Sequence, residues 1–224
     1  MAYQFEFGVI ADYLPVLGKG LALTGLLTLV GATLGVALGI GCAWVRTQGP
    51  RWLRPVAAGY VELFRNTPFL VQLFFIFFGL PAAGVQLGEF SAAALAMVVN
   101  LGAYSGEIIR AGIEATPRGQ WEAGASLAMT RLQIFRHVVL VPALQRIWPA
   151  LSSQIVIVML GSAVCSQIAA EELTFAANFI QSRSFRAFEV YIVVTGIYLA
   201  LSVLLRQLLR GVGGLMFPRR RAAR

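Results

Sequence analysis

The stretch EAGASLAMTRLQIFRHVVLVP, residues 122–142, is a polar, arginine-bearing segment between long apolar runs. Helix-forming residues occur throughout it, and its one acidic residue, Glu122, stands at its start. Connections between neighbouring helices are usually about two to eight residues long. A polar segment of this length with helical propensity therefore predicts a structured element that contacts a partner protein.

The rest of the chain has the composition of an integral membrane protein. Of its 224 residues, 58% are hydrophobic and only 12% are charged, and the mean hydropathy is +0.75. Soluble domains carry about 25% charged residues, whereas a transmembrane helix needs about 20 consecutive apolar residues. Composition and length thus predict an all-α, polytopic integral membrane protein of about five transmembrane helices.

The apolar runs place the predicted spans along the chain. With approximate boundaries, they cover residues 20–45, 59–80, 91–115, 147–167 and 190–210. These spans divide the chain into three parts. An N-terminal segment covers residues 1–19, a transmembrane domain covers residues 20–210 with a long loop at about 116–142, and a basic tail covers residues 211–224.

The isoelectric point of 10.3 is typical of nucleic-acid-binding proteins, but here the charges are sorted by side of the membrane. With the N-terminus outside, every basic residue except Lys19, Arg183 and Arg186 lies inside or at the inner end of a span. This positive-inside bias predicts an external N-terminus and a cytoplasmic C-terminus. Most acidic residues fall on the outer side: Glu6, Asp12, Glu89, Glu171, Glu172 and Glu189.

Catalytic and metal-binding chemistry have little support in the sequence. His137 is the only histidine and lies within residues 122–142, so no intramembrane Ser–His pair or histidine metal site can form. Cys42 and Cys165 fall in different spans, where we expect the small thiols to fill space. A GxxxxGK[ST] loop for ATP is absent, and the only lysine, Lys19, is external. We expect no catalytic residue, metal or cofactor in this chain.

The second span begins with ELFRNTPFLVQLFFIFFGLP, residues 62–81. Proline removes an intrahelical hydrogen bond and its ring crowds the preceding turn, so Thr67-Pro68 predicts a kinked or restarted helix. Glu62 and Arg65, at i and i+3, are expected to form an ion pair near the inner interface.

The third span carries NLGAYSGEIIR, residues 100–110. Asn100, Tyr104 and Glu107 share one helical face, and polar groups inside a membrane are costly unless they face protein or a water-filled cavity. This stripe could line a solute path. Alternatively, Glu107 pairs with Arg110 and Asn100 bonds a neighbouring helix. For Glu107 we favour the ion pair, and for Asn100 both interpretations stay open.

The first span contains Gly31, Gly35 and Gly39, which form two overlapping GxxxG motifs. Small residues let helix backbones approach closely in lipid, where no hydrophobic drive joins helices. We expect these glycines to pack against another helix.

The run at residues 62–81 resembles the ELFRxTPxLVQLFFxxFGLP signature of polar amino acid permeases of the ATP-binding-cassette importers. GAYSGEIIR, residues 102–110, continues the similarity as GAYxxExxR, and Gly119-Gln120 follows it. Residues 172–186, ELTFAANFIQSRSFR, are similar to the outer loop that faces the substrate-binding protein in that family. Over about residues 16–208, the chain resembles a permease subunit of a type I importer, histidine-permease-like (HisM/HisQ-like).

Residues 122–142 resemble the EAA loop of the same importers, which forms the coupling helix that docks on the ATPase subunit. Leu140 fits the end of the family pattern, but Val141 stands where the family has its Pro, and Pro142 comes one place later. Gly124 stands where the family has its second Ala, and Ala128 where it has a Gly. The resemblance implies an ATPase contact through Glu122, Ala123, Gly124, Ala128 and Leu132, on a helix whose apolar face also includes Ala125, Leu127 and Phe135.

The resemblance also implies a fold, a function and partners. It implies the type I importer permease fold with a cytoplasmic coupling helix, in a bacterial inner (plasma) membrane, with the N-terminus in the periplasm. This chain and a second permease subunit, identical or paralogous, would form the translocation path for an amino acid. ATPase subunits that hold Mg-ATP and a periplasmic substrate-binding protein are the implied partners, and nucleic acid is not.

An amino acid at mid-depth needs hydrogen-bond donors for its carboxylate and acceptors for its ammonium, in a site that excludes water. The polar groups available there are Asn100 and Tyr104 on the third span, with Gln154 and Ser162 on the fourth. Gly161 would let a substrate or backbone approach closely, because it has no side chain. These five residues form the predicted substrate pocket, and helix–helix hydrogen bonding is the alternative role for them.

The sequence also indicates a class of substrate. Residues 160–166, LGSAVCS, occupy the place where the family often reads Lys-Asp-Thr/Ser-Ser, and Gly161 replaces the Asp. A buried cationic side chain needs a nearby carboxylate, and the span residues Glu62 and Glu107 lie nearer the inner side. A neutral or acidic amino acid is therefore favoured over arginine or lysine.

Two other classes of protein fit part of the pattern. An ATP-independent secondary carrier or channel would have the same spans and charge bias, but would give no reason for the helical segment at residues 122–142. A purely structural membrane anchor would need no polar stripe such as Asn100, Tyr104 and Glu107. An importer permease should co-purify with an ATPase subunit, whereas a carrier should transport alone in liposomes.

Overall fold

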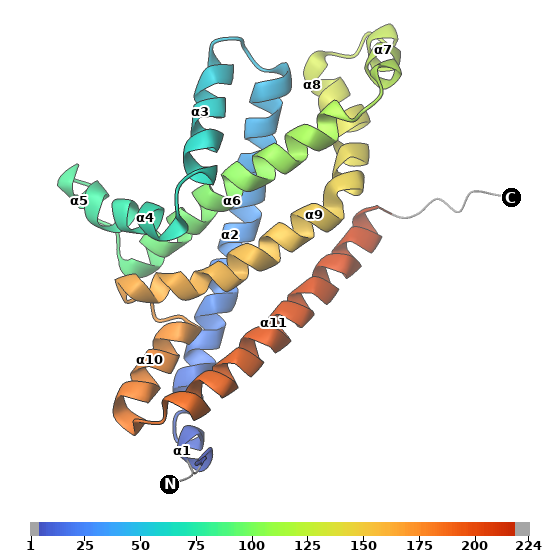
Figure 1. The fold of residues 1–224 in the computed structure, drawn as a ribbon. Helices are drawn as coiled ribbons and strands as arrows, with labels where there is room; N and C mark the ends of the chain where they lie inside the picture. Colours follow the sequence, from blue (N-terminus) through green and yellow to red (C-terminus); the bar gives the residue numbers. More distant parts are fainter. Residues whose placement is uncertain (1–4, 218–224) are drawn as a thin grey trace, which may run out of the picture.

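The computed structural model describes residues 5–217, and every regular element within that range is a helix, which confirms the all-α prediction (Figure 1). Of the predicted tail at residues 211–224, residues 211–216 instead continue α11, and residues 218–224 lie outside the described residues. In chain order the elements are α1 Gly8–Ala11, α2 Leu14–Gln48, α3 Leu53–Arg65, α4 Phe69–Phe74, the π-helical η1 Phe75–Gly79, α5 Leu80–Ala82, α6 Glu89–Glu114, α7 Arg118–Ser126, α8 Arg131–Gln133, the π-helical η2 Ile134–Val139, α9 Leu140–Gly161, the 3₁₀ helix η3 Ser162–Ile168, α10 Leu173–Ser184 and α11 Ala187–Met216.

Four stretches of the described chain are long and apolar enough to cross a membrane, and a bent pair supplies a fifth. Three of them, α2, α6 and α11, contain the predicted first, third and fifth spans to within a residue. The helix of the fourth span begins at Arg131, well before the predicted residue 147, and runs to Ile168. The second half of the segment at residues 122–142 is therefore continuous with a span.

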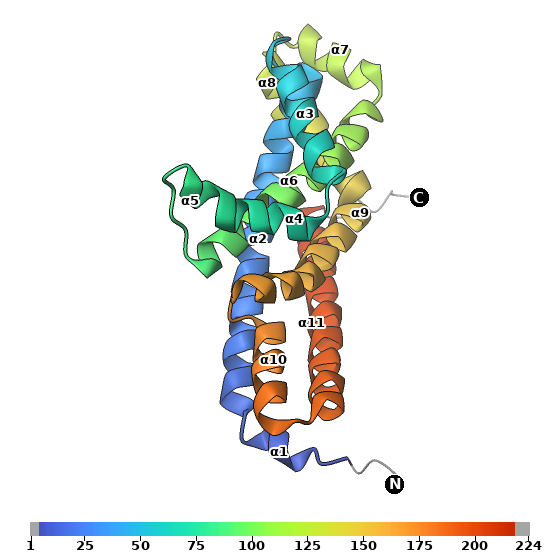
Figure 2. The same cartoon turned by 60° about the vertical axis from the view of Figure 1, so that its left-hand side comes forward.

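The second span is broken where the sequence predicts. α3 ends at Arg65, the backbone at Pro68 is extended (φ −62°, ψ 139°), and the helix that restarts at Phe69 turns by 112°. The cause is proline, which cannot continue the hydrogen-bond ladder and disfavours helical backbone at the residue before it. In Figures 1 and 2, α4 and α5 project sideways from the lower end of α3.

The glycines of the first span allow α2 to lie against α6, as predicted. A Cβ atom added at Gly35 would stand 2.9 Å from Leu101 Cβ, and one added at Gly31 would stand 3.3 Å from Met97 Cβ. The close approach also lets the Ser105 hydroxyl donate a hydrogen bond to the Gly35 carbonyl at 3.2 Å. α2 and α6 thus form the rigid centre on which the other elements are placed.

Three apolar clusters hold the bundle together. The largest joins α2, α4, α6 and α9 around Leu73, Met97 and Leu151. A second, near the N-terminus, joins α1, α2, α10 and α11, and a third, near α7, joins α2, α6 and η2. α7 and α8 lie at one end of the molecule and α1 and α10 at the other (Figure 2).

Residues 172–186, predicted as an outer loop, instead form a packed helix. α10 buries Leu173, Ala176, Ala177 and Ile180, a helical spacing that the surrounding polar residues obscured in the sequence. Glu172 caps its start by accepting a hydrogen bond from Phe175 N at 2.8 Å. Its side chain is fully buried, so this residue of the predicted outer loop does not face solvent.

The predicted single helix after Glu122 is also wrong. α7 ends at Ser126, and Ala128 adopts the left-handed conformation (φ 56°). A capping box between Thr130 and Gln133 then begins the next helix, because its two reciprocal hydrogen bonds satisfy backbone donors at the helix start. The segment is a helix–turn–helix corner whose second arm continues into α9.

Candidate functional site

A cavity of about 450 Å³ lies beside the break in the second span. Its walls come from the break itself, from α6 and from the second half of α9. Four of the five residues predicted for the substrate pocket line it, namely Asn100, Tyr104, Gln154 and Gly161. The remaining lining residues are Thr67, Pro68, Phe69, Ile157, Val158 and Val164.

Ser162, the fifth predicted pocket residue, is not in the cavity wall. It is fully buried, and its hydroxyl donates to the Met159 carbonyl at 2.7 Å. The helix tightens into 3₁₀ geometry at this residue, which alters the angle between successive side chains. Gln154, Ile157, Val158 and Gly161 share one face of α9 at i, i+3, i+4 and i+7, and Ser162, at i+8, is turned away from that face.

Sequence reasoning missed the wall formed by Thr67, Pro68 and Phe69. The break at Pro68 was expected, and an interrupted helix inside a membrane is itself a signal for a solute site, because its freed backbone is tolerated only beside protein or a cavity. The pocket prediction did not extend to these residues.

Asn100 both joins helices and faces the cavity, so the two interpretations of this residue are compatible. Its Nδ2 donates to Gln72 Oε1 at 2.9 Å. Gln72 Nε2 in turn donates to the Phe64 carbonyl at 2.8 Å and to the Thr67 carbonyl at 3.0 Å. This relay fixes the break of the second span to α6, which sets the shape of the cavity wall.

Some polar groups in the cavity wall have no hydrogen-bond partner among the described residues. Among the described residues, no hydrogen bond goes to Asn100 Oδ1 or involves the Gln154 side chain, and no acidic or basic side chain lines this cavity. An acceptor and an amide with both donor and acceptor capacity are thus available to a bound zwitterion.

A second cavity, of about 350 Å³, lies nearer α7 and is rich in charge. Glu107 accepts from Arg46 Nη1 at 2.5 Å and from Arg110 Nη2 at 2.5 Å, so the predicted Glu107–Arg110 ion pair is confirmed. The lining residues are Arg46, Val61, Glu62, Arg65, Asn66, Tyr104, Glu107 and Arg110.

The predicted Glu62–Arg65 pair is not among the ion pairs of residues 5–217. Arg65 instead turns toward α6, where its guanidinium carbon lies 5.8 Å from the centre of the Tyr104 ring. Its Nη1 stands 4.0 Å from Glu107 Oε2. The long arginine side chain gains more from the aromatic face and the partly buried Glu107 carboxylate than from exposed Glu62.

The residues expected to contact the ATPase lie on the corner formed by α7 and α8. Glu122, Ala123, Ala128 and Leu132 are exposed there. Gly124 is buried, and a Cβ atom on it would stand 2.8 Å from Ile134 Cγ1, so this glycine seats α7 on η2.

Apolar side chains on this corner divide between its surface and its core. Leu127 and Leu132 are 76% and 57% exposed, whereas Phe135, expected on the contact face, is buried. The corner thus presents a small apolar surface on a packed base.

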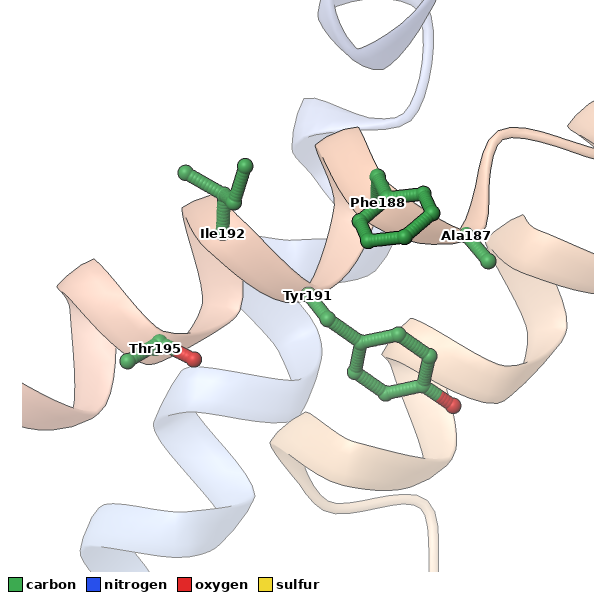
Figure 3. Close-up of a pocket in the computed structure, with 5 residues that line it drawn as sticks. All are labelled: Ala187, Phe188, Tyr191, Ile192 and Thr195. Atoms are coloured by element: carbon green, nitrogen blue, oxygen red, sulfur yellow. The ribbon is translucent and has the colours of Figure 1, made fainter.

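A shallow apolar pocket lies at the start of α11, away from both cavities, and Figure 3 shows its side chains along one stretch of that helix. Tyr191 directs its hydroxyl to Asn178 Oδ1 at 2.7 Å. The lining is otherwise almost wholly apolar: Ala187, Phe188, Ile192 and Thr195. Such a surface suits lipid or an apolar partner, and it lacks the polar groups that a zwitterion needs.

The cysteines and the histidine do not gather with other ligands. Cys42 and Cys165 are both free and buried, on α2 and η3. Within residues 5–217, no three His, Cys, Asp or Glu side chains come together as a metal site would require.

Comparison with known proteins identifies the family. The model of the binding-protein-dependent transport system inner membrane component family matches residues 35–213. The glutamine transport system permease protein GlnP of Escherichia coli K12 is 32% identical over 209 residues, which cover 92% of this chain and 95% of GlnP. The L-cystine transport system permease protein TcyB of Bacillus subtilis is 37% identical over 195 residues, covering 87% of this chain and 83% of TcyB.

A solved structure, the crystal structure of an amino acid ABC transporter with histidines, superposes with a TM-score of 0.83 at 36% identity. The match covers 94% of this chain and 99% of that one. The fold described above, with its bent second span and the corner at α7, therefore matches an architecture already known from a solved structure. The chain belongs to the binding-protein-dependent transport system inner membrane component family, among its amino acid ABC transporter permeases.

Proposed function

We propose that this chain is the transmembrane permease subunit of an ATP-driven amino acid importer, and that the cavity beside the helix break is its solute site. The observation that carries the proposal is the meeting of Asn100, Tyr104, Gln154 and Gly161 in that cavity. They come from two spans and surround space that suits an amino acid. Their free amide groups match the donors and acceptors of a zwitterion.

The proposed assembly contains two permease subunits, identical or paralogous, with two ATPase subunits that hold Mg-ATP and a periplasmic substrate-binding protein. The N-terminus lies in the periplasm and the C-terminus in the cytoplasm of a bacterial inner membrane. The positive-inside bias supports this orientation. It puts α7 and α8 on the cytoplasmic side, where an ATPase subunit can reach them.

The proposed mechanism transmits ATPase closure to the cavity through α9. α7 is seated on η2 through Gly124 and Ile134, and the helix that begins at Arg131 continues to Gly161 at the cavity wall. A displacement of the corner therefore moves Gln154 and Gly161. Repetition in the second permease subunit opens and closes the cavity toward alternate sides, so that the solute crosses without a continuous pore.

The proposed substrate is a neutral amino acid. The cavity lining carries no formal charge among the described residues, and a cationic side chain would need a carboxylate close by. The names of the two relatives described above refer to glutamine and L-cystine, which are neutral overall, whereas another relative at 31% identity is named for arginine. Glutamine, which also carries an amide, is the first solute to test.

Uptake by the complete importer in liposomes tests the proposal. Wild-type complex should take up labelled L-glutamine, L-cystine or another amino acid only with ATP and the binding protein. Asn100→Ala should reduce this uptake at least about tenfold, because a lost hydrogen bond to a charged group costs about 1.5–3 kcal/mol. Thr33→Ala, an exposed position on α2, is the control and should not change uptake.

Two outcomes would contradict the proposal. Solute uptake by this chain alone, without ATP, would instead identify a secondary carrier or channel. If the Asn100→Ala complex and the Gln154→Ala complex both took up the solute normally, the solute site would lie elsewhere.

A further inference from the structure

We propose that the charged cavity beside Glu107 is a second station on the solute path, in which Arg65 binds the carboxylate of the amino acid after it leaves the first cavity. The inference rests on the proposed function, since it takes the solute to be an amino acid. It adds a binding site on the α7 side of the helix break and a specific role for Arg65.

The two cavities adjoin. Tyr104 lines both of them, and the break between α3 and α4 separates them. Asn66 faces the charged cavity, whereas Thr67 and Pro68 face the first one. A solute that moves from the first cavity toward α7 therefore passes the Tyr104 ring and meets Arg65, whose guanidinium lies over that ring at 5.8 Å.

The charge of the second cavity suits an anion. Its lining holds three arginines, Arg46, Arg65 and Arg110, against two glutamates, Glu62 and Glu107. Arg46 and Arg110 both bond Glu107 at 2.5 Å, so those three charges largely satisfy one another. Of the three arginines, Arg65 is the one held least by the protein.

Arg65 has N–H donors that are available to bind a ligand. Its nearest described ionic contact is the 4.0 Å approach to Glu107 Oε2, and its side chain is 42% exposed. A guanidinium offers five N–H donors in a planar fork that matches a carboxylate with two parallel hydrogen bonds. The α-carboxylate is the one anionic group that every neutral amino acid carries, and Arg65 is placed to receive it.

The two proposed binding sites differ in charge, and this difference favours movement of the solute from the first to the second. The first cavity offers neutral amides, which bind a zwitterion without holding its charge firmly. The second offers a fixed cation on the exit side, so the carboxylate exchanges one partner for another as the solute moves. A desolvated carboxylate without any partner is costly, and Arg65 removes that cost at the step where the solute leaves the amides.

Binding to the membrane complex of permease and ATPase subunits in nanodiscs, without ATP and without the binding protein, tests this inference. A labelled mixture of the protein amino acids with cystine first identifies the amino acid that the wild-type complex takes up in liposomes. Saturation binding of that amino acid should then show two classes of site. Arg65→Gln should weaken one class about tenfold or more, and Asn100→Ala should weaken the other.

Matched variants keep the test decisive. Arg51→Gln removes an exposed arginine that lines neither cavity, and it should leave both classes unchanged. Arg65→Lys keeps the charge but loses the planar fork, so it should weaken the same class less than Arg65→Gln does. If the complex with Arg65→Gln does not assemble, weaker amino acid binding by the complex with Arg65→Lys tests the inference instead.

Three results would overturn the inference. The first is unchanged binding in Arg65→Gln or, if that variant does not assemble, in Arg65→Lys. The second is loss of the Arg65-dependent class when phosphatidylcholine in the nanodiscs is replaced by phosphatidylglycerol, which would assign Arg65 to an anionic lipid headgroup. The third is a wild-type complex that takes up no amino acid at all, which would refute the proposed function as well. The first two leave the proposed function intact, so the failures are distinguishable.

Discussion

Glu172 is a fully buried carboxyl group between the fourth span and α10. It accepts hydrogen bonds from Phe175 N at 2.8 Å and from the Tyr198 hydroxyl at 2.6 Å. Burial raises its pKa above the ordinary value, and the hydrogen bonds to it oppose that rise only in part. A single side chain therefore makes the stability of the α10 end of the bundle depend on pH.

The sign of that dependence follows from the direction of the shift. Because the pKa of Glu172 is higher in the folded state than its ordinary 4.5, the folded protein binds this proton more tightly. Its contribution to stability is fully present below the ordinary value and is lost as the pH rises through the folded pKa. Glu172→Gln should flatten the fall in melting temperature between pH 4.5 and neutrality, as measured on the purified complex.

Glu171→Gln is the matched control for Glu172→Gln. Glu171 is the preceding residue, is about half exposed, and pairs with Lys19 at the surface. Its substitution should leave the slope of melting temperature against pH as in the wild type. Equal slopes in all three proteins would contradict the assignment of the pH dependence to Glu172.

Ala128 carries backbone strain that a glycine would relieve. Its φ of 56° is in the left-handed region, where a Cβ atom costs about 1–2 kcal/mol. Glycine at this position would remove that cost, but it is more flexible in the unfolded chain, which offsets part of the gain in stability. Ala128→Gly should therefore raise stability by about 0.5–1 kcal/mol, measured as a higher melting temperature.

The same change in a neighbouring helical residue should have the opposite sign. Ala125→Gly lies inside α7, where glycine costs about 0.5–1 kcal/mol relative to alanine. A lower melting temperature for both variants would show that the turn at Ala128 does not hold in the complex.

The packing of α2 on α6 depends on glycine at specific positions. Gly35→Ala would bring its Cβ to 2.9 Å from Leu101 Cβ, whereas a Cβ at Gly25 meets nothing within 4 Å. We expect Gly35→Ala to destabilise the subunit by about 1–3 kcal/mol through overpacking. Gly25→Ala should be neutral or slightly stabilising, because alanine favours the helix. Melting temperatures of the two variants in detergent check this contrast, and equal effects would contradict it.

Elements were predictable from the sequence where one strong local signal decided them. Pro68 fixed the break of the second span, and the glycine spacing fixed the contact between α2 and α6. α10 was missed because charged and amide residues surround its apolar face, so polarity was given more weight than the spacing of Leu173, Ala176, Ala177 and Ile180. The turn at Ala128 was missed because alanine is a strong helix former, and only the capping box at Thr130 and Gln133 marks the new start.

At the scale of the whole molecule, four of the five residues predicted for the pocket line one cavity, and their role in binding a solute stays a prediction. Asn100 and Tyr104 lie on a regular α-helix, so their shared face followed from their spacing. Ser162 was included for its polarity near mid-depth, although its spacing from Gln154 and Gly161 places it off the face that those two residues share. The charged cavity was not foreseen because Arg65 and Glu107 come from different spans, and a single sequence does not indicate which spans are neighbours.

The corner of α7 and α8 should hold the ATPase subunit. Glu122 is exposed beside the apolar surface of Leu127 and Leu132. Glu122→Lys should reduce the amount of ATPase subunit that co-purifies and raise the ATP hydrolysed per solute imported, while the spans stay folded. Glu89→Lys, an exposed change at the opposite end of α6, should leave co-purification normal. A normal yield of ATPase subunit with Glu122→Lys would contradict the assignment.

The broken second span also affects how the chain enters the membrane during synthesis. α3 has 13 residues and is about 20 Å long, as is the α4–α5 half, whereas the hydrocarbon core is about 30 Å thick. Neither half can cross alone, and lipid cannot satisfy the backbone groups freed at the 112° bend. Those groups are satisfied through Gln72, which Asn100 of α6 holds in place. Because α6 is made after α5, the α3–α5 pair must wait at the membrane interface during translation and insert together with α6.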